Sequence, residues 1–117
     1  MTTLMQMKGG IPIVEPNGNI IGTAASDLQE ELVSRVNATE AACVLINFAH
    51  VHKIDSCGLG ALVSAYIEAR QKKGRIGIIN VGGNIRNLVV RSRLIRLFEH
   101  FDTEDAAVAS LSADTWH

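Results

Sequence analysis

The sequence predicts a single α/β domain, in which strands alternate with helices to form a layered sheet with right-handed crossovers. Two continuous apolar runs, ACVLINF (42–48) and RIGIINV (75–81), are typical of parallel strands covered on both faces. Between and around these runs, apolar residues recur at helical spacing. At 117 residues the chain has the length of one domain, so we expect residues 1–117 to form one unit.

The N-terminal part of the domain begins with an extended segment. IPIVEPNGNI (11–20) alternates apolar and polar residues around Asn17-Gly18, a strong turn dipeptide, which predicts a strand, a turn and a further extended stretch. Pro12 and Pro16 favour a position at the edge of the sheet, because proline cannot donate a ladder hydrogen bond. The run at 42–48 is then expected to be a central parallel strand.

The first helix is predicted from Ser26 onward, over about three turns. Ser26 and Gln29 resemble a capping box, and acidic residues follow in the first turn. The apolar residues at helical spacing are Ala25, Leu28, Leu32 and Val36.

Three further helices complete the predicted pattern. The second begins at DSCGLG (55–60), buries a face that carries Leu59, Leu62, Val63 and Tyr66, and ends at Gly74. NIRNLVV (84–90) has helical spacing as well. The last helix is expected to start at Thr103, whose hydroxyl can cap it while Glu104 and Asp105 complement the helix dipole.

Composition limits the kinds of partner and chemistry. A formal net charge of −1 and a pI near 6.4 offer no basic field for nucleic acid. No apolar run reaches the roughly 18 residues of a membrane span, and the N-terminus lacks a signal peptide's apolar centre, so we expect a cytoplasmic protein without membrane insertion. Cys43 and Cys57 are expected to be free thiols, and neither they nor the four histidines have the spacing of a metal site. No cofactor or metal is expected.

The stretch HKIDSCGLGAL (52–62) is the candidate functional site. It lies between an apolar strand and a helix, where functional groups gather in parallel sheets. Gly58 and Gly60 leave the backbone of the first helical turn unshielded, so the N–H groups and the helix dipole can receive an anion. A phosphate carried by Ser56 fits such a position.

IDSCGLGAL (54–62) resembles the phosphorylation-site motif of the STAS domain of bacterial anti-sigma factor antagonists. In that motif Asp-Ser is followed, after one small residue, by Gly-Leu-Gly and an apolar residue. The Gly18 turn, the strand before the motif, GRIGIINV (74–81) and the tail LFEHFDTEDAAVASL (97–111) extend the similarity over most of the chain. The resemblance implies a small, mixed, mainly parallel sheet of four to five strands flanked by about four α-helices.

The resemblance also implies a function. The protein is expected to be an anti-sigma factor antagonist, not an enzyme, which binds an anti-sigma factor that is also a serine kinase and is released when that kinase phosphorylates Ser56. A serine phosphatase would reverse the modification. The protein would act as a monomer or weak homodimer. The expected partner-binding residues are Asp55, Ser56, Cys57, Gly58, Leu59 and Gly60.

Two positions depart from the family pattern. After the turn glycine, where relatives usually carry acidic residues that contact the partner, this chain reads Gly18-Asn19-Ile20-Ile21-Gly22, so that contact cannot be transferred. Arg93 replaces a glycine that often ends the third helix.

The segment 84–98 contains four arginines and no acid. Arg86 and Arg93 are candidate partner-binding residues in this segment. The simpler interpretation is a solvated face with intrachain ion pairs.

Alternatives remain for both residues and function. Ser56 can be a simple N-cap, Asp55 a solvated cap partner, and the two glycines a means of close helix packing. Cys57 is better explained as a small filler than as a redox thiol. The second functional hypothesis is a STAS subunit of a stressosome-like scaffold or of a lipid-transport complex. A serine hydrolase or a Walker-type nucleotide site is excluded because Gly-x-Ser-x-Gly and Gly-Lys-Ser/Thr are absent.

Overall fold

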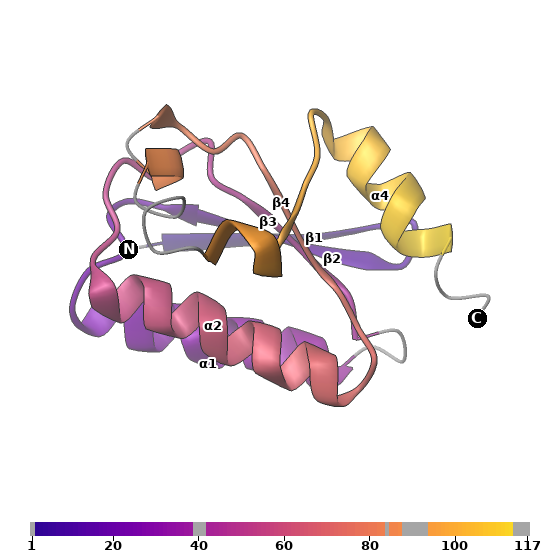
Figure 1. Ribbon diagram of the computed structural model, residues 1–117, viewed down its shortest axis with the longest axis horizontal. Helices are drawn as coiled ribbons and strands as arrows, with labels where there is room; N and C mark the ends of the chain where they lie inside the picture. Colours follow the sequence, from indigo (N-terminus) through magenta and orange to yellow (C-terminus); the bar gives the residue numbers. More distant parts are fainter. Residues whose placement is uncertain (1, 39–41, 84, 88–93, 114–117) are drawn as a thin grey trace.

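A computed structural model describes residues 2–38, 42–83, 85–87 and 94–113, and it shows an α/β fold (Figure 1). The elements in chain order are β1 (Thr2–Lys8), β2 (Ile11–Asn17), α1 (Thr23–Ala38), β3 (Val44–Asn47), α2 (Ser56–Gln71), β4 (Ile76–Ile79), the 3₁₀ helix η1 (Leu94–Leu97), β5 (Glu99–His100) and α4 (Glu104–Ala113). Residues 83 and 85–87 are also helical, while Leu88 and Val89 of the predicted third helix lie outside the described residues.

The five strands form one sheet in the order β1-β2-β3-β4-β5. β1 is antiparallel to β2, and the other three pairs are parallel. β3, the predicted buried run, is the central strand, with Leu45 opposite Ile13 of β2 and Gly77 of β4. The predicted small, mixed, mainly parallel sheet is therefore confirmed.

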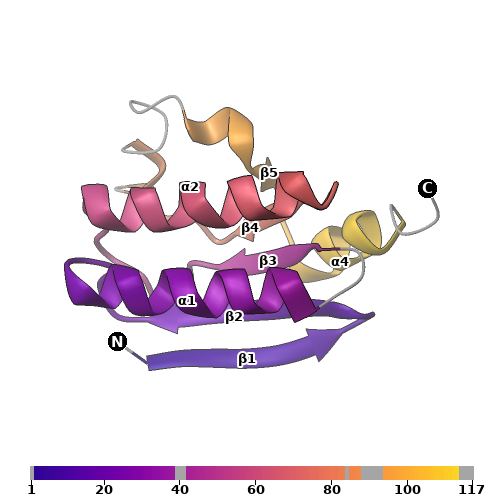
Figure 2. The ribbon, with the colours of Figure 1, turned by 90° about the horizontal axis from the view of Figure 1, so that it is seen from below.

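Helices cover the two faces of this sheet unequally (Figure 2). α1 and α2 lie side by side on one face, where the larger core includes Val14, Ile46 and Ile78. α4 packs on the other face, where Leu111 joins a smaller cluster around Leu45. Alternation of side chains along each strand supplies both cores, which is why β3 and β4 read as continuous apolar runs.

The N-terminal strand and its hairpin are absent from the sequence-based prediction. β1 pairs with β2 in register from Thr2↔Asn17 to Lys8↔Ile11, and Gly9 and Gly10, both at positive φ (59° and 80°), form the two-residue turn. The predicted edge position of Pro12 and Pro16 is therefore wrong, because β2 lies between β1 and β3. Pairing of β2 with β3 is confined to Ile13 and Val14, between the two prolines, so neither is required to donate to β3.

The start of α1 differs from the prediction. The helix begins at Thr23, three residues before Ser26, and has 16 residues, longer than the expected three turns. No acidic residue lies in its first turn, so the capping box and the acidic first turn were wrong; the carbonyls of Ile21 and Gly22 accept from the amides of Ala24 and Ala25. The predicted apolar face is correct, and its four residues are buried: Ala25, Leu28, Leu32 and Val36.

α2 packs through small residues as well as through the predicted large ones, since Leu59 and Tyr66 also contact the core. Leu62 is buried as predicted, but Leu59, Val63 and Tyr66 are only partly buried. The other buried positions of the helix are Gly58, Ala61, Ala65 and Ala69. Small side chains allow α1 and α2 to approach closely.

The C-terminus of α2 is closed by a Schellman motif. The amides of Lys73 and Gly74 donate to the carbonyls of Arg70 and Ala69, and Lys73 takes the positive φ of 61°. Gly74 is required for another reason: a Cβ there would lie 2.0 Å from the carbonyl oxygen of Ala42. The glycine therefore marks the end of the helix by close backbone packing and not by a left-handed conformation.

Candidate functional site

Asp55 is the N-cap of α2 and joins two distant segments of the chain. Its Oδ1 accepts from the amide of Gly58 (2.9 Å), and its Oδ2 accepts from the amide of Gly22 (3.1 Å) in the segment before α1. The hydrogen bond from Gly58, followed by the one from Gly22, lowers the pKa of Asp55 below its ordinary value. The carboxylate is therefore held ionised by backbone donors. Asp55, which the sequence analysis considered as a solvated cap partner, is itself the N-cap residue.

Ser56 is the first residue of α2 and is exposed, as predicted. Its hydroxyl makes no side-chain hydrogen bond within the described part of the chain, because Asp55 already occupies the amide of Gly58. The interpretation of Ser56 as a simple N-cap is thus wrong. Its side chain is left accessible to a macromolecule at the positive end of a helix dipole.

Gly58 and Gly60 have different structural roles. A Cβ on Gly58 would lie 2.3 Å from Cγ1 of Ile54 and 2.6 Å from the carbonyl oxygen of Ile20, so this position accepts only glycine. A Cβ on Gly60 would meet nothing within 4 Å, and Gly60 is exposed. Close packing explains the first glycine and leaves the second without a structural requirement.

The segment before α1 forms one wall of the site. Ile20 forms an isolated parallel β-bridge with Ile54. The amide of Ile20 donates to the carbonyl of Lys53 (2.9 Å), and the carbonyl of Ile20 accepts from the amide of Asp55 (3.3 Å). These bonds place Ile21, with 45% of its surface exposed, directly beside the motif. Sequence reasoning did not identify Ile21. The available signal was the pair of isoleucines in NGNIIG (17–22), at a place where the family resemblance led us to expect acidic residues.

The two cysteines occupy different environments. Neither cysteine forms a disulfide: Cys57 is exposed in the first turn of α2, and Cys43 is buried before β3 against the α4 side of the core. The described ranges contain no group of three or more histidines, cysteines or carboxylates able to hold a metal.

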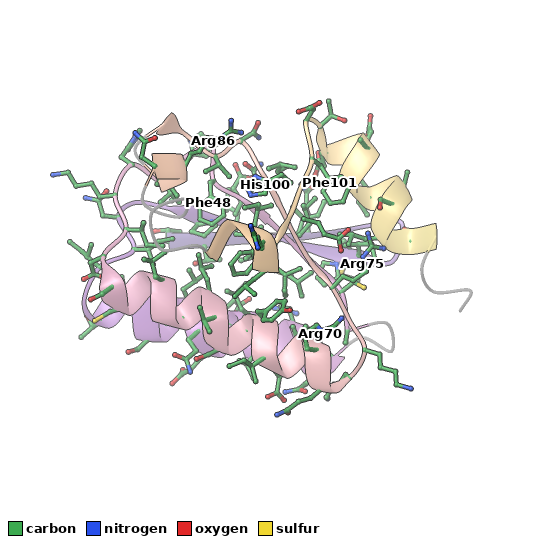
Figure 3. All side chains as sticks on the ribbon, in the orientation of Figure 1. Phe48, Arg70, Arg75, Arg86, His100 and Phe101 are labelled. Atoms are coloured by element: carbon green, nitrogen blue, oxygen red, sulfur yellow. The ribbon has the colours of Figure 1, made fainter. Side chains whose placement is uncertain are left out.

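The two arginines proposed as partner contacts do not lie in the motif. Arg86 is exposed in the helical stretch after β4, and its amide donates to the carbonyl of Gly82 (Figure 3). Burial and then the nearby Arg86 charge lower the pKa of His100. Arg93 lies outside the described residues. The structure therefore brings together Asp55 through Gly60 with Ile21, and assigns Arg86 to a separate surface element.

No helix in the described part of the chain is both long and apolar enough to cross a membrane.

Comparison with known proteins defines the class. Residues 3–107 match the family model of the STAS domain, and the chain belongs to this family. The fold is shared with an anti-sigma factor antagonist from Mycobacterium paratuberculosis (TM-score 0.80, 23% identity, covering 94% of this chain and 92% of that one). No curated protein sequence matches the chain significantly.

A second similar structure is known in two states. The anti-sigma factor antagonist SpoIIAA in its unphosphorylated form matches with a TM-score of 0.81 and 17% identity, covering 96% of this chain and 97% of that one. The phosphorylated form of SpoIIAA from Bacillus matches with a TM-score of 0.71 and 18% identity over 93% and 98%. At these identities the likeness establishes the fold.

Proposed function

We propose that this STAS protein is an anti-sigma factor antagonist that acts by partner switching. Unmodified, it binds an anti-sigma factor that is also a serine kinase; phosphorylated on Ser56, it is released; a serine phosphatase restores binding. The observation that carries the proposal is the division of roles between neighbours: Asp55 caps α2, so the exposed Ser56 hydroxyl has no structural duty. A phosphate can be added there without loss of the cap.

Electrostatics accounts for the direction of the switch. A phosphate adds about −1.5 to −2 charges at neutral pH. It would stand next to a carboxylate that is already ionised, and the dipole of α2 offsets only part of that repulsion. Ser56 is exposed, so water also solvates the phosphate and the isolated fold tolerates it, whereas an interface shaped for a neutral hydroxyl would have to desolvate it without a partner charge.

The proposed docking surface combines polar and apolar groups. Ser56, Cys57 and Gly60 are exposed, and Leu59 is partly exposed. Gly58 is buried and Asp55 is engaged in capping, so these two act by shaping the surface. Ile21 supplies the large apolar side chain that interfaces use as an anchor. In the proposed surface, Ile21 replaces the contact that acidic residues after the turn glycine are expected to make in relatives.

The other parts of the proposal follow from the same role. The protein serves as a substrate and a binding partner and not as an enzyme, works in the cytoplasm without cofactor or nucleic acid, and is a monomer or weak homodimer. That a protein of this fold, SpoIIAA, has been described in unphosphorylated and phosphorylated forms supports the proposal.

Calorimetric titration against an anti-sigma kinase encoded next to this chain tests the switch. We expect phosphorylation of Ser56 or Ser56→Asp to weaken binding at least tenfold, and Ser56→Ala to bind normally but resist release by the kinase. Ser56→Asp should change the free energy of unfolding by no more than about 1 kcal/mol. Ser26→Asp, at an exposed serine in α1, is the matched control and should bind normally.

Two results would contradict the proposal: equal affinity of the phosphorylated and unmodified proteins, or a Ser56→Asp protein that loses binding only because it unfolds. Stable co-purification in a large assembly, indifferent to Ser56, would instead support the alternative of a scaffold or lipid-transport subunit.

A further inference from the structure

A hollow of about 190 Å³ lies at the opposite end of α2 from Ser56. It is formed by the last turns of α2, the start of β4, η1 and β5, and its charged lining consists of Arg70, Arg75, Arg96 and Glu99. Arg70 and Arg75 are labelled in Figure 3. Three guanidinium groups and one carboxylate leave a surplus of two positive charges. Arg70 is about 21 Å along the helix from Ser56, so the hollow is separate from the proposed phosphorylation site.

Arg75 and Glu99 form the fixed wall of the hollow. The guanidinium of Arg75 donates to both carboxylate oxygens of Glu99, and also to the carbonyl (3.0 Å) and hydroxyl (2.9 Å) of Ser110 in α4. Only 18% of the Arg75 side chain is exposed. A bidentate arginine–carboxylate pair of this kind is rigid and electrically balanced. The surplus charge therefore resides on Arg70 and Arg96.

Arg70 and Arg96 are exposed cations without a carboxylate partner among the described residues. The carboxylate that lines the same hollow, Glu99, is already engaged by Arg75. Both guanidinium groups line the same small hollow, so one anion bound there would be attracted by both. Guanidinium groups are suited to phosphate, since their planar donors match its oxygens.

The hollow also has an aromatic wall of fixed orientation. Tyr66 lines it one helical turn before Arg70, and its ring meets Phe98 edge to face, with centroids 6.0 Å apart and an interplanar angle of 68°. Such a contact favours this orientation of the Tyr66 ring. The hollow therefore offers a dianion site beside a rigid aromatic surface.

We infer that this hollow binds a phosphate group, either as inorganic phosphate or as the phosphate of a small ester, with Arg70 and Arg96 as its ligands. The two uncompensated positive charges match the charge of a phosphate dianion. The Arg75–Glu99 pair connects β4 to β5 beside the hollow. Because its two charges cancel, it adds no net charge to the phosphate site.

Titration of the ¹⁵N-labelled protein with inorganic phosphate at constant ionic strength tests the site. We expect amide shifts at Tyr66, Arg70, Leu97 and Glu99, and about tenfold weaker binding for Arg70→Gln and for Arg96→Gln. The matched control is Lys72→Gln, which removes an exposed charge from the same helix end but does not line the hollow, and it should retain affinity within about twofold. Thermal melts verify that each variant folds.

Three results would overturn the inference: no saturable shift with phosphate, equal losses for Lys72→Gln and Arg70→Gln, or shifts centred on 56–60 at the helix N-terminus. A parallel titration with phenyl phosphate identifies the source. Tighter binding of phenyl phosphate that Arg70→Gln weakens supports an ester whose organic part contacts Tyr66, and equal binding supports inorganic phosphate.

Discussion

The two ends of α2 have the same arrangement with opposite charges: at each end a charged side chain with hydrogen-bond partners lies near a polar or charged side chain without them among the described residues. At the N-terminus, the Asp55 carboxylate is bound by two backbone amides, and the adjacent Ser56 hydroxyl has no structural partner in the described chain. At the C-terminal end, Arg75 is bound by Glu99 and Ser110, and the nearby Arg70 has no ionic partner among the described residues. In each case one group maintains the fold, and its neighbour, which has no such structural role, is the residue that we propose for recognition. Asp55 and Arg75 are both charged and both serve the fold, so charge alone does not identify the residues of a binding site.

The largest effect is expected at the glycines of the motif. Gly58→Ala forces a Cβ to within 2.3 Å of Ile54 and 2.6 Å of the Ile20 carbonyl, and we expect a loss of about 2–4 kcal/mol in the free energy of unfolding. Gly60→Ala, the matched control, meets open space in a helix interior and should stabilise the protein by about 0.5–1 kcal/mol. Urea denaturation measures both. Equal effects would show that the two glycines do not differ as described.

At the other end of α2, substitutions of Arg75 and Arg70 should also differ in their effect on stability. Arg75→Gln breaks the contacts to Glu99 and Ser110 and should cost about 1–3 kcal/mol of stability, because the hydrogen bonds of a largely buried guanidinium are lost. Arg70→Gln should change stability by less than about 0.5 kcal/mol. Chemical denaturation decides the point, and an equally destabilised Arg70→Gln would mean that Arg70 has a structural partner.

A smaller effect, dependent on pH, is expected at Asp55. Its pKa is lowered in the folded protein, so the ionised cap stabilises the fold above the ordinary value of 3.8, and this contribution is lost as the pH falls through the lower folded value. Asp55→Asn keeps the shape and an acceptor oxygen but loses the charge. We expect it to lower the melting temperature at neutral pH and to converge with the parent protein in acid. A constant difference at all pH values would contradict the role of charge.

Much of the sheet is predictable from local patterns. The apolar runs at 42–48 and 75–81 contain β3 and β4, and Thr103 caps α4 as expected, with its hydroxyl accepting from the amide of Ala106 (3.1 Å). β1 is harder to predict, because its alternating but mostly exposed residues gain their order from pairing with β2. β5 has only two residues, too few for any periodicity.

The candidate site was recognisable from its motif, but the roles within it were not. Asp55 and Ser56 are both good N-caps, and only the geometry assigns the cap to Asp55. The requirement for Gly58 depends on Ile20, which is 38 positions earlier, and the position of Ile21 depends on the Ile20–Ile54 bridge. Contacts between segments this far apart in the sequence produce no repeating pattern of residues from which they could be predicted.

The double attachment of the Asp55 carboxylate has a consequence for the kinetics of recognition. One side chain fixes both the segment that carries Ile21 and the first turn of α2, so the surface around Ser56 is a single body before any partner arrives. Ordering a loop during association would reduce affinity through lost conformational entropy, and that loss has already occurred during folding here. A partner that binds as proposed would therefore meet a preorganised surface, and the lifetime of the complex would depend on the contacts it makes and not on a loop closing over it.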